Sequence, residues 1–175
     1  MAKLTEKKAI ELLKKYSKDK KSFDIVLAHS KTVQKTALEI AEDIPSIDTE
    51  YIMMGSLLHD IGRFDTWPNN NEKHGIKGAE ILRNENLPEF ARLAERHLGA
   101  GISKEDILEQ GLDLPLKDYL PITKEEKIIT HADNLTEGAK RISLKETIAR
   151  FEKELGKKAA NKVKRLAEEV ENMKK

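Results

Sequence analysis

The stretch MMGSLLHDIGRF, residues 53–64, sets a histidine and an aspartate side by side in a strongly apolar window. Its Met, Leu and Ile side chains predict a helix that packs in the core. A carboxylate taken out of water costs several kcal/mol unless a partner compensates it. For Asp60 that partner is either a cation held together with His59, or a cap on the turn at Gly62, or an ion pair with Arg63.

Apolar residues recur at three- and four-residue steps on both sides of this stretch, which is the spacing of one helix face. The first half of the chain is expected to form helices over residues 5–16, 24–43, 50–61, 75–85 and 88–97. Asp48 or Thr49 can cap the third of these helices, and Gly62 is expected to end it. Residues 63–75 contain Pro68 and three consecutive asparagines, so we predict a loop there.

Capping boxes mark three helix starts in the second half of the chain, at Ser103, Thr123 and Ser143. Residues 111–122 hold two prolines and predict an ordered loop. The last helix is expected at about residues 157–174. Because strand signals are nearly absent, we predict one all-α domain over residues 1–175, a compact bundle of roughly eight or nine helices.

Composition limits the classes of function. The 32 basic and 31 acidic side chains leave a net charge of +1, so no global field favours a long nucleic acid or a membrane as partner. The chain has no cysteine, which excludes disulfides and thiolate-bound zinc. No window approaches 18 consecutive apolar residues, and the N-terminus lacks a signal-like apolar block. We therefore expect a cytoplasmic protein.

Imidazoles and carboxylates together are ligands for zinc, iron or manganese. The chain has five histidines and a second carboxylate in an apolar helical segment, and the residues concerned are His29, His59, His74, His97, His131 and Asp133. Adjacent helical residues point about 100° apart, so His59 and Asp60 need further ligands from other helices. His29 and Asp133 are the best placed to supply them. His131 lies two residues before Asp133 and faces another way, which indicates a supporting or structural role.

In chain order, His29, the pair His59–Asp60 and Asp133 resemble the H…HD…D motif of the HD-domain metal-dependent phosphohydrolase superfamily. HDIGR at residues 59–63 is similar to the family's HD followed by Ile-Gly-Lys, with Arg63 in place of the lysine. The resemblance covers about residues 25–142 and leaves further helices over residues 143–175.

The resemblance extends to the binuclear members of the superfamily, because His74 and His97 match their two additional histidines. The segments HGIKGAEIL and IITHADNLTEGAKR are most similar to the branch that contains bacterial symmetrical diadenosine-tetraphosphate hydrolases. The match therefore implies two divalent ions, iron or manganese, with zinc, nickel or cobalt as alternatives.

By position, the resemblance assigns a first ion to His29, His59, Asp60 and Asp133. It assigns a second ion to His74 and His97, with Asp60 bridging both. Paired ions about 3.5–4 Å apart hold a hydroxide that attacks phosphorus in line, and Asp133 could orient that hydroxide or accept its proton. Asp60, Asp133 and Arg63 are thus the expected catalytic residues.

Phosphate charge needs cationic partners. The candidates for contacts with the substrate are Arg63, Lys77, Arg96, Arg141 and, for a nucleobase, Trp67. Arg63 is favoured, since arginine binds phosphate through two parallel hydrogen bonds. For Lys77, Arg96 and Arg141 a solvated helix face is the competing interpretation, and for Trp67 it is a loop anchor packed on the core.

The implied function is hydrolysis of a phosphoester or phosphoanhydride in a small nucleotide-like substrate, with a dinucleoside polyphosphate as one candidate. Alternatives are a cyclic-nucleotide phosphodiesterase or nucleotidase on the same site, a di-iron oxygenase, and a metal-binding sensor domain without turnover. Mononuclear nucleotidases of the superfamily carry a glutamate soon after the HD pair, and this chain has none there. The sequence is compatible with a homodimer.

Overall fold

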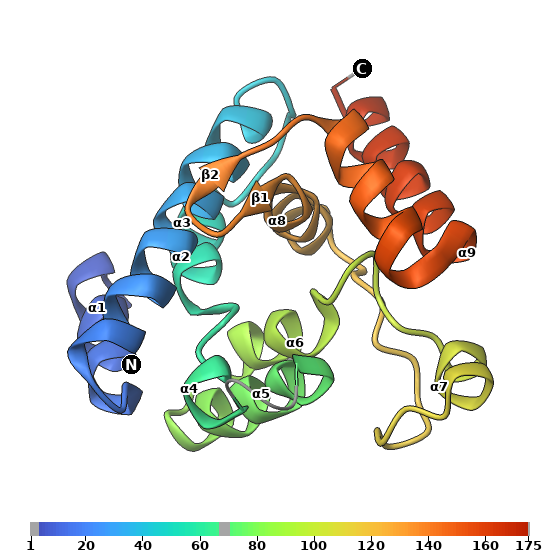
Figure 1. The fold of residues 1–175 in the computed structure, drawn as a ribbon. Helices are drawn as coiled ribbons and strands as arrows, with labels where there is room; N and C mark the ends of the chain where they lie inside the picture. The colour runs from blue at the N-terminus through green and yellow to red at the C-terminus, as the bar shows by residue number, and fades with distance from the viewer. Residues whose placement is uncertain (1–3, 67–70, 175) are drawn as a thin grey trace.

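The computed structural model describes residues 4–66 and 71–174, and these residues are almost entirely helical (Figure 1). The helices are α1 (Glu6–Tyr16), α2 (Lys20–Ala41), α3 (Thr49–Leu58), α4 (Arg63–Thr66), α5 (His74–Asn84), α6 (Pro88–Arg96), α7 (Lys104–Gln110), α8 (Lys124–Asn134) and α9 (Leu144–Asn172). A short 3-10 helix, η1, covers Asn71–Lys73. Strands β1 (Thr136–Glu137) and β2 (Lys140–Arg141) form one small antiparallel hairpin. The all-α prediction is confirmed.

Local capping explains where most helices begin. The capping boxes at Ser103, Thr123 and Ser143 are all present, each with the acidic side chain three residues on bonded back to the cap. Asp48 rather than Thr49 caps α3, because its carboxylate accepts from the backbone N–H of Tyr51.

The predicted end of α3 at Gly62 was wrong, and the reason lies in the packing of the next helices. Helix α3 ends at Leu58, and the chain then turns through His59 and Asp60 into the short helix α4. A Cβ on Gly62 would lie only 1.9 Å from the carbonyl oxygen of His74. Because Gly62 has no Cβ, this turn can lie directly against the backbone of α5.

Two further boundaries differ from the sequence prediction. Residues 63–75 were expected to be a loop, but they contain α4 and η1, and α5 already begins at His74. A helix that starts after Ser143 and a last helix over about residues 157–174 were expected separately, and the structure joins the two in α9. Gly156 interrupts α9 with φ 86°, so the expected C-terminal helix is the second of its two pieces.

The core forms where α2, α3 and α8 pack together at the centre of the molecule. Figure 1 shows α5 and α6 side by side, α9 along the opposite flank of α8, and α7 out at the edge. The HD turn, residues 59–62, joins α3 to α4 and packs against α5 at Gly62. In the described part of the chain, no helix combines the length and apolar character that crossing a membrane requires.

Candidate metal centre

The fold brings together the six predicted metal ligands from five different elements. His29 lies in the middle of α2, and the other five residues lie at or near helix ends, namely His59 and Asp60 after α3, His74 at the start of α5, His97 after α6, and Asp133 in the last turn of α8. Helix ends suit this task because a side chain there can point along the axis into the space that several helices enclose.

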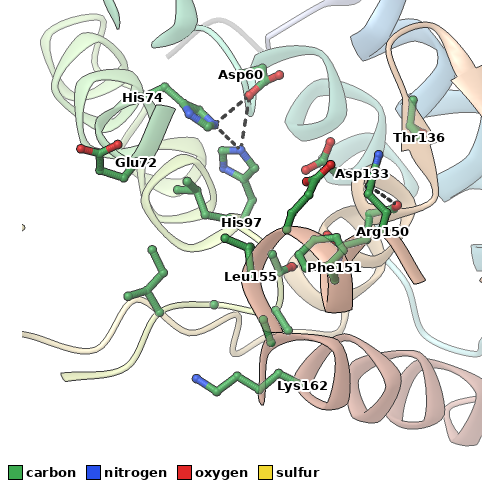
Figure 2. A pocket seen from close by; sticks show the side chains of 18 of the residues that line it. Asp60, Glu72, His74, His97, Asp133, Thr136, Arg150, Phe151, Leu155 and Lys162 are labelled. Carbon is green, nitrogen blue, oxygen red and sulfur yellow. Dashed lines mark hydrogen bonds and ion pairs between the residues drawn. The ribbon is translucent and has the colours of Figure 1, made fainter. Parts of the chain in front are cut away.

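Asp60 lies between two pairs of imidazoles and offers a different oxygen to each pair. Its Oδ1 is 3.1 Å from Nε2 of His74 and 3.4 Å from Nε2 of His97. Its Oδ2 is 3.5 Å from Nε2 of His29 and 3.7 Å from Nε2 of His59. Figure 2 shows the first of these groups, with Asp60 above His74 and His97. The carboxylate therefore has one oxygen on the side of His74 and His97 and the other on the side of His29 and His59.

Asp133 completes the group on the side of His29 and His59. Its Oδ1 is 2.9 Å from Nε2 of His29 and 3.5 Å from Nε2 of His59. Ligand atoms about 2.0–2.2 Å from one ion lie roughly 3–4 Å from each other, so these separations are those of a coordination shell. The ligand atoms of His29, His59 and Asp133 lie within 4.8 Å of one another, as do those of His59, Asp60 and His97.

Backbone carbonyls fix the tautomer of three of the imidazoles. Nδ1 donates to a carbonyl oxygen in the pairs His29–Gly138 at 2.7 Å, His59–Ser56 at 2.7 Å and His97–Ala94 at 2.8 Å. A carbonyl can only accept, so Nδ1 carries a proton in each ring, and Nε2 is the nitrogen that faces the cluster and would bind an ion. These rings are oriented as metal ligands need to be.

Two buried atoms without hydrogen-bond partners also indicate that these residues suit a divalent ion. Among the described residues, the buried atoms His59 Nε2 and Asp60 Oδ1 have no aligned hydrogen-bond partner, although imidazoles lie close to Asp60 Oδ1. Buried polar atoms are rarely left in this way. A cation with nitrogen and oxygen ligands would satisfy both, and the donor set suits manganese, iron or zinc.

Charge keeps both carboxylates ionised. Burial disfavours the charged form of Asp60, but Arg63 and His59 nevertheless hold its pKa well below its ordinary value. Burial acts on Asp133 in the same way, and its contacts with His29 and His59 lower its pKa further than burial raises it. The pKa of His29 is raised to about 9, since its bond to Asp133 outweighs burial.

Arg63 is the one predicted phosphate-binding cation that the structure brings to this cluster. Its Nε lies 2.5 Å from Oδ2 of Asp60, and the side chain stays about one third exposed. Asp60 is its only ion-pair partner in the part of the chain that is described. Its two terminal nitrogens therefore have no further ion-pair partner among the described residues.

The other predicted cations lie elsewhere. Each of them forms an ion pair away from the predicted metal ligands, and the pairs are Lys77–Glu80 at 2.7 Å, Arg96–Glu126 at 3.1 Å and Arg141–Glu39 at 2.5 Å. For Lys77 and Arg141 the competing interpretation of a solvated face agrees with these positions. Arg96 instead neutralises a buried glutamate that also caps α8. Trp67 lies outside the described residues.

His131 is buried and separate from the cluster. Burial and the nearby charges of Arg141 and Lys174 lower its pKa to about 4, so it is neutral at pH 7. This position agrees with the structural role expected from its spacing to Asp133.

A cavity of about 1150 Å³ extends towards α9 from the six predicted metal ligands, which together are called the metal cluster. Sequence reasoning identified His29, Asp60, Arg63, His74, His97 and Asp133 among its lining residues, but it missed the wall formed by α9. That wall includes Arg150 and Phe151 (Figure 2). Their segment, IARFEKEL, carries only an ordinary amphipathic pattern, so no local signal distinguishes it from a surface helix.

Comparison with known proteins gives one family and several relatives. The HD domain family model matches residues 26–138. Over 173 residues the chain is 43% identical to the uncharacterised protein MJ0778 of Methanocaldococcus jannaschii, with 95% of this chain and 96% of that protein covered.

Two relatives carry the name tRNA (cytidine(56)-2′-O)-methyltransferase. The protein of Picrophilus torridus is 43% identical over 157 residues, and that of Thermoplasma volcanium is 35% identical over 162 residues. The alignments cover 89% and 92% of this chain but only 44% and 45% of those proteins. The chain thus spans less than half the length of either methyltransferase.

Among solved structures, the HD domain of the L. monocytogenes phosphodiesterase PgpH is similar, with a TM-score of 0.53. The match covers 94% of this chain and 97% of that one, at 14% identity. At this identity the similarity concerns the fold alone, and it agrees with the helical architecture described above.

Proposed function

We propose that this chain, which belongs to the HD domain family, is a metal-dependent phosphohydrolase. Its substrate would be a phosphoester or phosphoanhydride of a small nucleotide-like molecule. The observation that carries the proposal is the position of Asp60, whose two oxygens face two separate pairs of imidazoles. This arrangement supports two ions held side by side, which suits hydrolysis at phosphorus.

The six predicted ligands would form two ion sites. His29, His59, Asp60 and Asp133 would hold one ion, and His74, His97 and Asp60 the other. Bound there, two divalent ions would supply an activated water at neutral pH and positive charge for the phosphate oxygens. Iron or manganese is proposed because the ligands are all nitrogen and oxygen.

Asp133 would orient a water molecule, and Arg63 would bind the phosphate of the substrate. Asp133 lines the cavity and keeps 16% of its side chain exposed, so it can orient a water molecule by accepting a hydrogen bond. Arg63 is anchored through Nε to Asp60, which leaves its two terminal nitrogens for a phosphate. The ion pair that offsets the burial of Asp60 thus also positions a phosphate-binding group.

The size of the cavity supports a substrate larger than a phosphate ion. About 1150 Å³ exceeds the usual range of roughly 300–1,000 Å³ for small-molecule sites, so the volume is sufficient for a nucleotide or a dinucleoside polyphosphate. Such a molecule would be the principal partner of the chain.

A phosphodiester of RNA is a second candidate substrate. The observation that favours it is the similarity to two proteins named as tRNA methyltransferases, in which a region like this chain is part of a longer protein. A cyclic or terminal phosphate on a nucleotide would meet the same metal cluster and the same arginine.

The test is a hydrolysis panel after the protein has been stripped of metal and reloaded with manganese, iron, cobalt or nickel. Substrates should include p-nitrophenyl phosphate, mononucleotides, 2′,3′- and 3′,5′-cyclic nucleotides and diadenosine tetraphosphate. We expect phosphate release that requires added metal and is absent in Asp60→Asn.

Product analysis separates the two candidates. Symmetrical cleavage of diadenosine tetraphosphate would support the dinucleotide, and preference for a 2′,3′-cyclic phosphate would support RNA. If no substrate is turned over with any metal, while the protein binds two ions per chain, the hydrolase proposal is wrong and a sensor domain is the better interpretation.

A further inference from the structure

We propose that Arg150 and Phe151 form a second binding subsite, the distal subsite, which holds the part of the substrate beyond the scissile phosphorus. The inference rests on the proposed function and narrows its substrate class. It selects phosphodiesters or phosphoanhydrides that carry a second phosphate and a planar ring, over simple monoesters.

Arg150 reaches the cavity from the first half of α9. Its Nη2 donates to the carbonyl oxygen of Asn134 at 3.0 Å, and its Nη1 lies 3.9 Å from Oε1 of Glu137. Asn134 directly follows Asp133, so the guanidinium is tied to the backbone beside a predicted metal ligand. A guanidinium has five N–H donors, and these contacts leave several of them for a ligand.

Phe151 adds an apolar surface next to this charge. The guanidinium carbon of Arg150 lies 5.5 Å from the centroid of the Phe151 ring, and both residues line the cavity. The edge of the ring faces Gly99, where a Cβ would lie 3.3 Å away and any side chain would narrow the space. Arginine and aromatic faces are surfaces on which planar rings stack, so the pair suits a nucleobase or ribose with its phosphate.

The cationic side chains of the cavity lining differ in how far other residues already occupy them. Among the described lining residues, four are basic, namely Arg63, Arg150, Lys158 and Lys162. The two lysines pair with Asp106, and Lys158 also pairs with Glu109. The two arginines have five N–H donors each, more than these contacts use, and one lies beside Asp60 while the other lies beside the end of α8.

A monoester has one phosphate and would engage only the arginine next to the metal cluster. A substrate with a second phosphate can reach Arg150 as well, and Figure 2 shows Arg150, Phe151 and Leu155 arriving from α9, across the cavity from His74. The competing interpretation is that Arg150 merely caps the last carbonyls of α8, together with Thr147. A cap would affect stability but would not distinguish between ligands.

The test compares two ligands on the manganese-loaded protein by calorimetry, with ADP as the probe for both subsites and inorganic phosphate as the probe for the metal cluster alone. The variants are Arg150→Lys and Phe151→Leu. Lys153→Met is the matched control, because Lys153 is exposed on α9 and does not line the cavity. We expect ADP binding to weaken about tenfold in Arg150→Lys and about threefold in Phe151→Leu, while phosphate binding stays within twofold.

Kinetics provide a second measurement. The KM for the best phosphodiester or phosphoanhydride of the panel should rise about tenfold in Arg150→Lys with kcat nearly unchanged, and both values for p-nitrophenyl phosphate should stay constant. Phe151→Leu leaves the bond to Asn134 intact, so it carries the test if Arg150→Lys lowers the melting temperature.

The two proposals fail separately. Equal loss of ADP and phosphate binding, no loss of either, or a wild-type protein that does not bind ADP would each overturn the distal subsite. Hydrolysis by wild type together with unchanged ADP binding in both variants leaves the proposed function standing. Weakened ADP binding in a protein without any hydrolytic activity supports the subsite and removes the proposed function.

Discussion

Asp60 connects the two halves of the metal cluster, because each of its oxygens faces a different pair of imidazoles. Replacing it by asparagine keeps the shape but removes the charge and one oxygen. We expect Asp60→Asn to lose both ions and His74→Ala to lose about one ion per chain. Metal analysis after manganese loading and gel filtration measures this directly.

His131→Gln serves as the matched control for metal content. His131 is buried like the ligands, yet it lies outside the cluster, so the variant should retain the wild-type number of ions. A wild-type protein that never holds more than one ion, or a His74→Ala variant with unchanged metal content, would contradict the binuclear model.

Arg63 is expected to act on substrate more than on metal. Arg63 lines the cavity, and Arg63→Met removes its guanidinium, which should lower kcat/KM by about 10- to 100-fold, the usual cost of one lost charged hydrogen bond. Arg63→Lys keeps the charge and should recover part of that loss. Steady-state kinetics at matched metal content checks this, and a parallel loss of manganese would instead assign Arg63 to holding Asp60.

At this scale the sequence predicted which six metal-ligating side chains the fold brings together, whereas the places of the predicted substrate-binding cations could be read only from the folded structure. His29, His74 and Asp133 could be found because their order resembles a known motif, and the structure brings them together. Arg96 could not be judged, since only the folded structure shows its buried partner Glu126. Arg150 was missed because its role depends on which helix covers the cavity.

The contact between the HD turn and α5 depends on Gly62. A Cβ there would lie 1.9 Å from His74 O and 2.4 Å from Gly78 N, so backbone must move to admit it. We expect Gly62→Ala to lower the free energy of unfolding by more than about 3 kcal/mol, measured by chemical denaturation. Where the variant still folds, His74 should be displaced and the second ion lost.

Gly111→Ala is the comparison for this measurement. Gly111 has φ 61°, and a Cβ there meets nothing within 4 Å, so only the backbone preference should matter, at about 1–2 kcal/mol. Equal costs for the two variants would mean that the close approach of the turn to α5 is easily relaxed.

Helix α7 is attached to α9 by a charged cluster. The carboxylate of Asp106 is buried, pairs with Lys162 and Lys158, and accepts from the backbone N–H of Ser103 at 2.8 Å. Burial raises its pKa, but Lys162 and Ser103 lower it further, so the folded value lies well below the ordinary one. A depressed folded pKa gives stability that is present above the unfolded pKa and is lost at lower pH.

The pH dependence of the free energy of unfolding tests this cluster. We expect Asp106→Asn to cost about 2 kcal/mol at pH 7, and the difference from wild type to shrink as pH falls below about 4. Asp113→Asn is the control, because Asp113 is 84% exposed in its pair with Lys73 and should change stability little. A difference that stays constant down to pH 2 would contradict the assignment.

Element boundaries were predictable where a local signal existed. All three capping boxes begin helices, since the side chain and backbone involved lie within one turn. The end of α3 and the helix α4 were not predictable, because contact with α5 decides both. The break at Gly156 depends on a backbone conformation with positive φ, which a glycine permits but which its presence in a sequence does not predict.

For the whole molecule, metal binding should contribute to stability. The ligands come from α2, α8 and the turns that flank α3, α5 and α6, so an ion joins parts of the chain that the unfolded state separates. Each manganese site at 100 times its Kd should add about 2.7 kcal/mol, which corresponds to a rise in Tm of about 5–10 °C for each ion bound. Differential scanning fluorimetry with manganese and with EDTA measures the shift.

Asp60→Asn provides the control, because it should show little shift at the same manganese concentration. A rise in Tm of equal size in the variant would mean that manganese stabilises the fold from another place. The overall architecture itself was predictable from periodicity and from the motif. The cavity was not, since its size depends on how α9 packs against α8 more than a hundred residues after His29.

The β-hairpin offers a way to reach the metal centre from outside. Surface hairpin tips commonly accept inserted peptides or attached dyes without unfolding a protein, and Gly138 is such a tip, with open space around it. Here the Gly138 carbonyl orients His29. A fluorophore or a ligand-responsive peptide placed at this tip would be mechanically linked to one metal ligand, which would turn the domain into a reporter of its own ion occupancy.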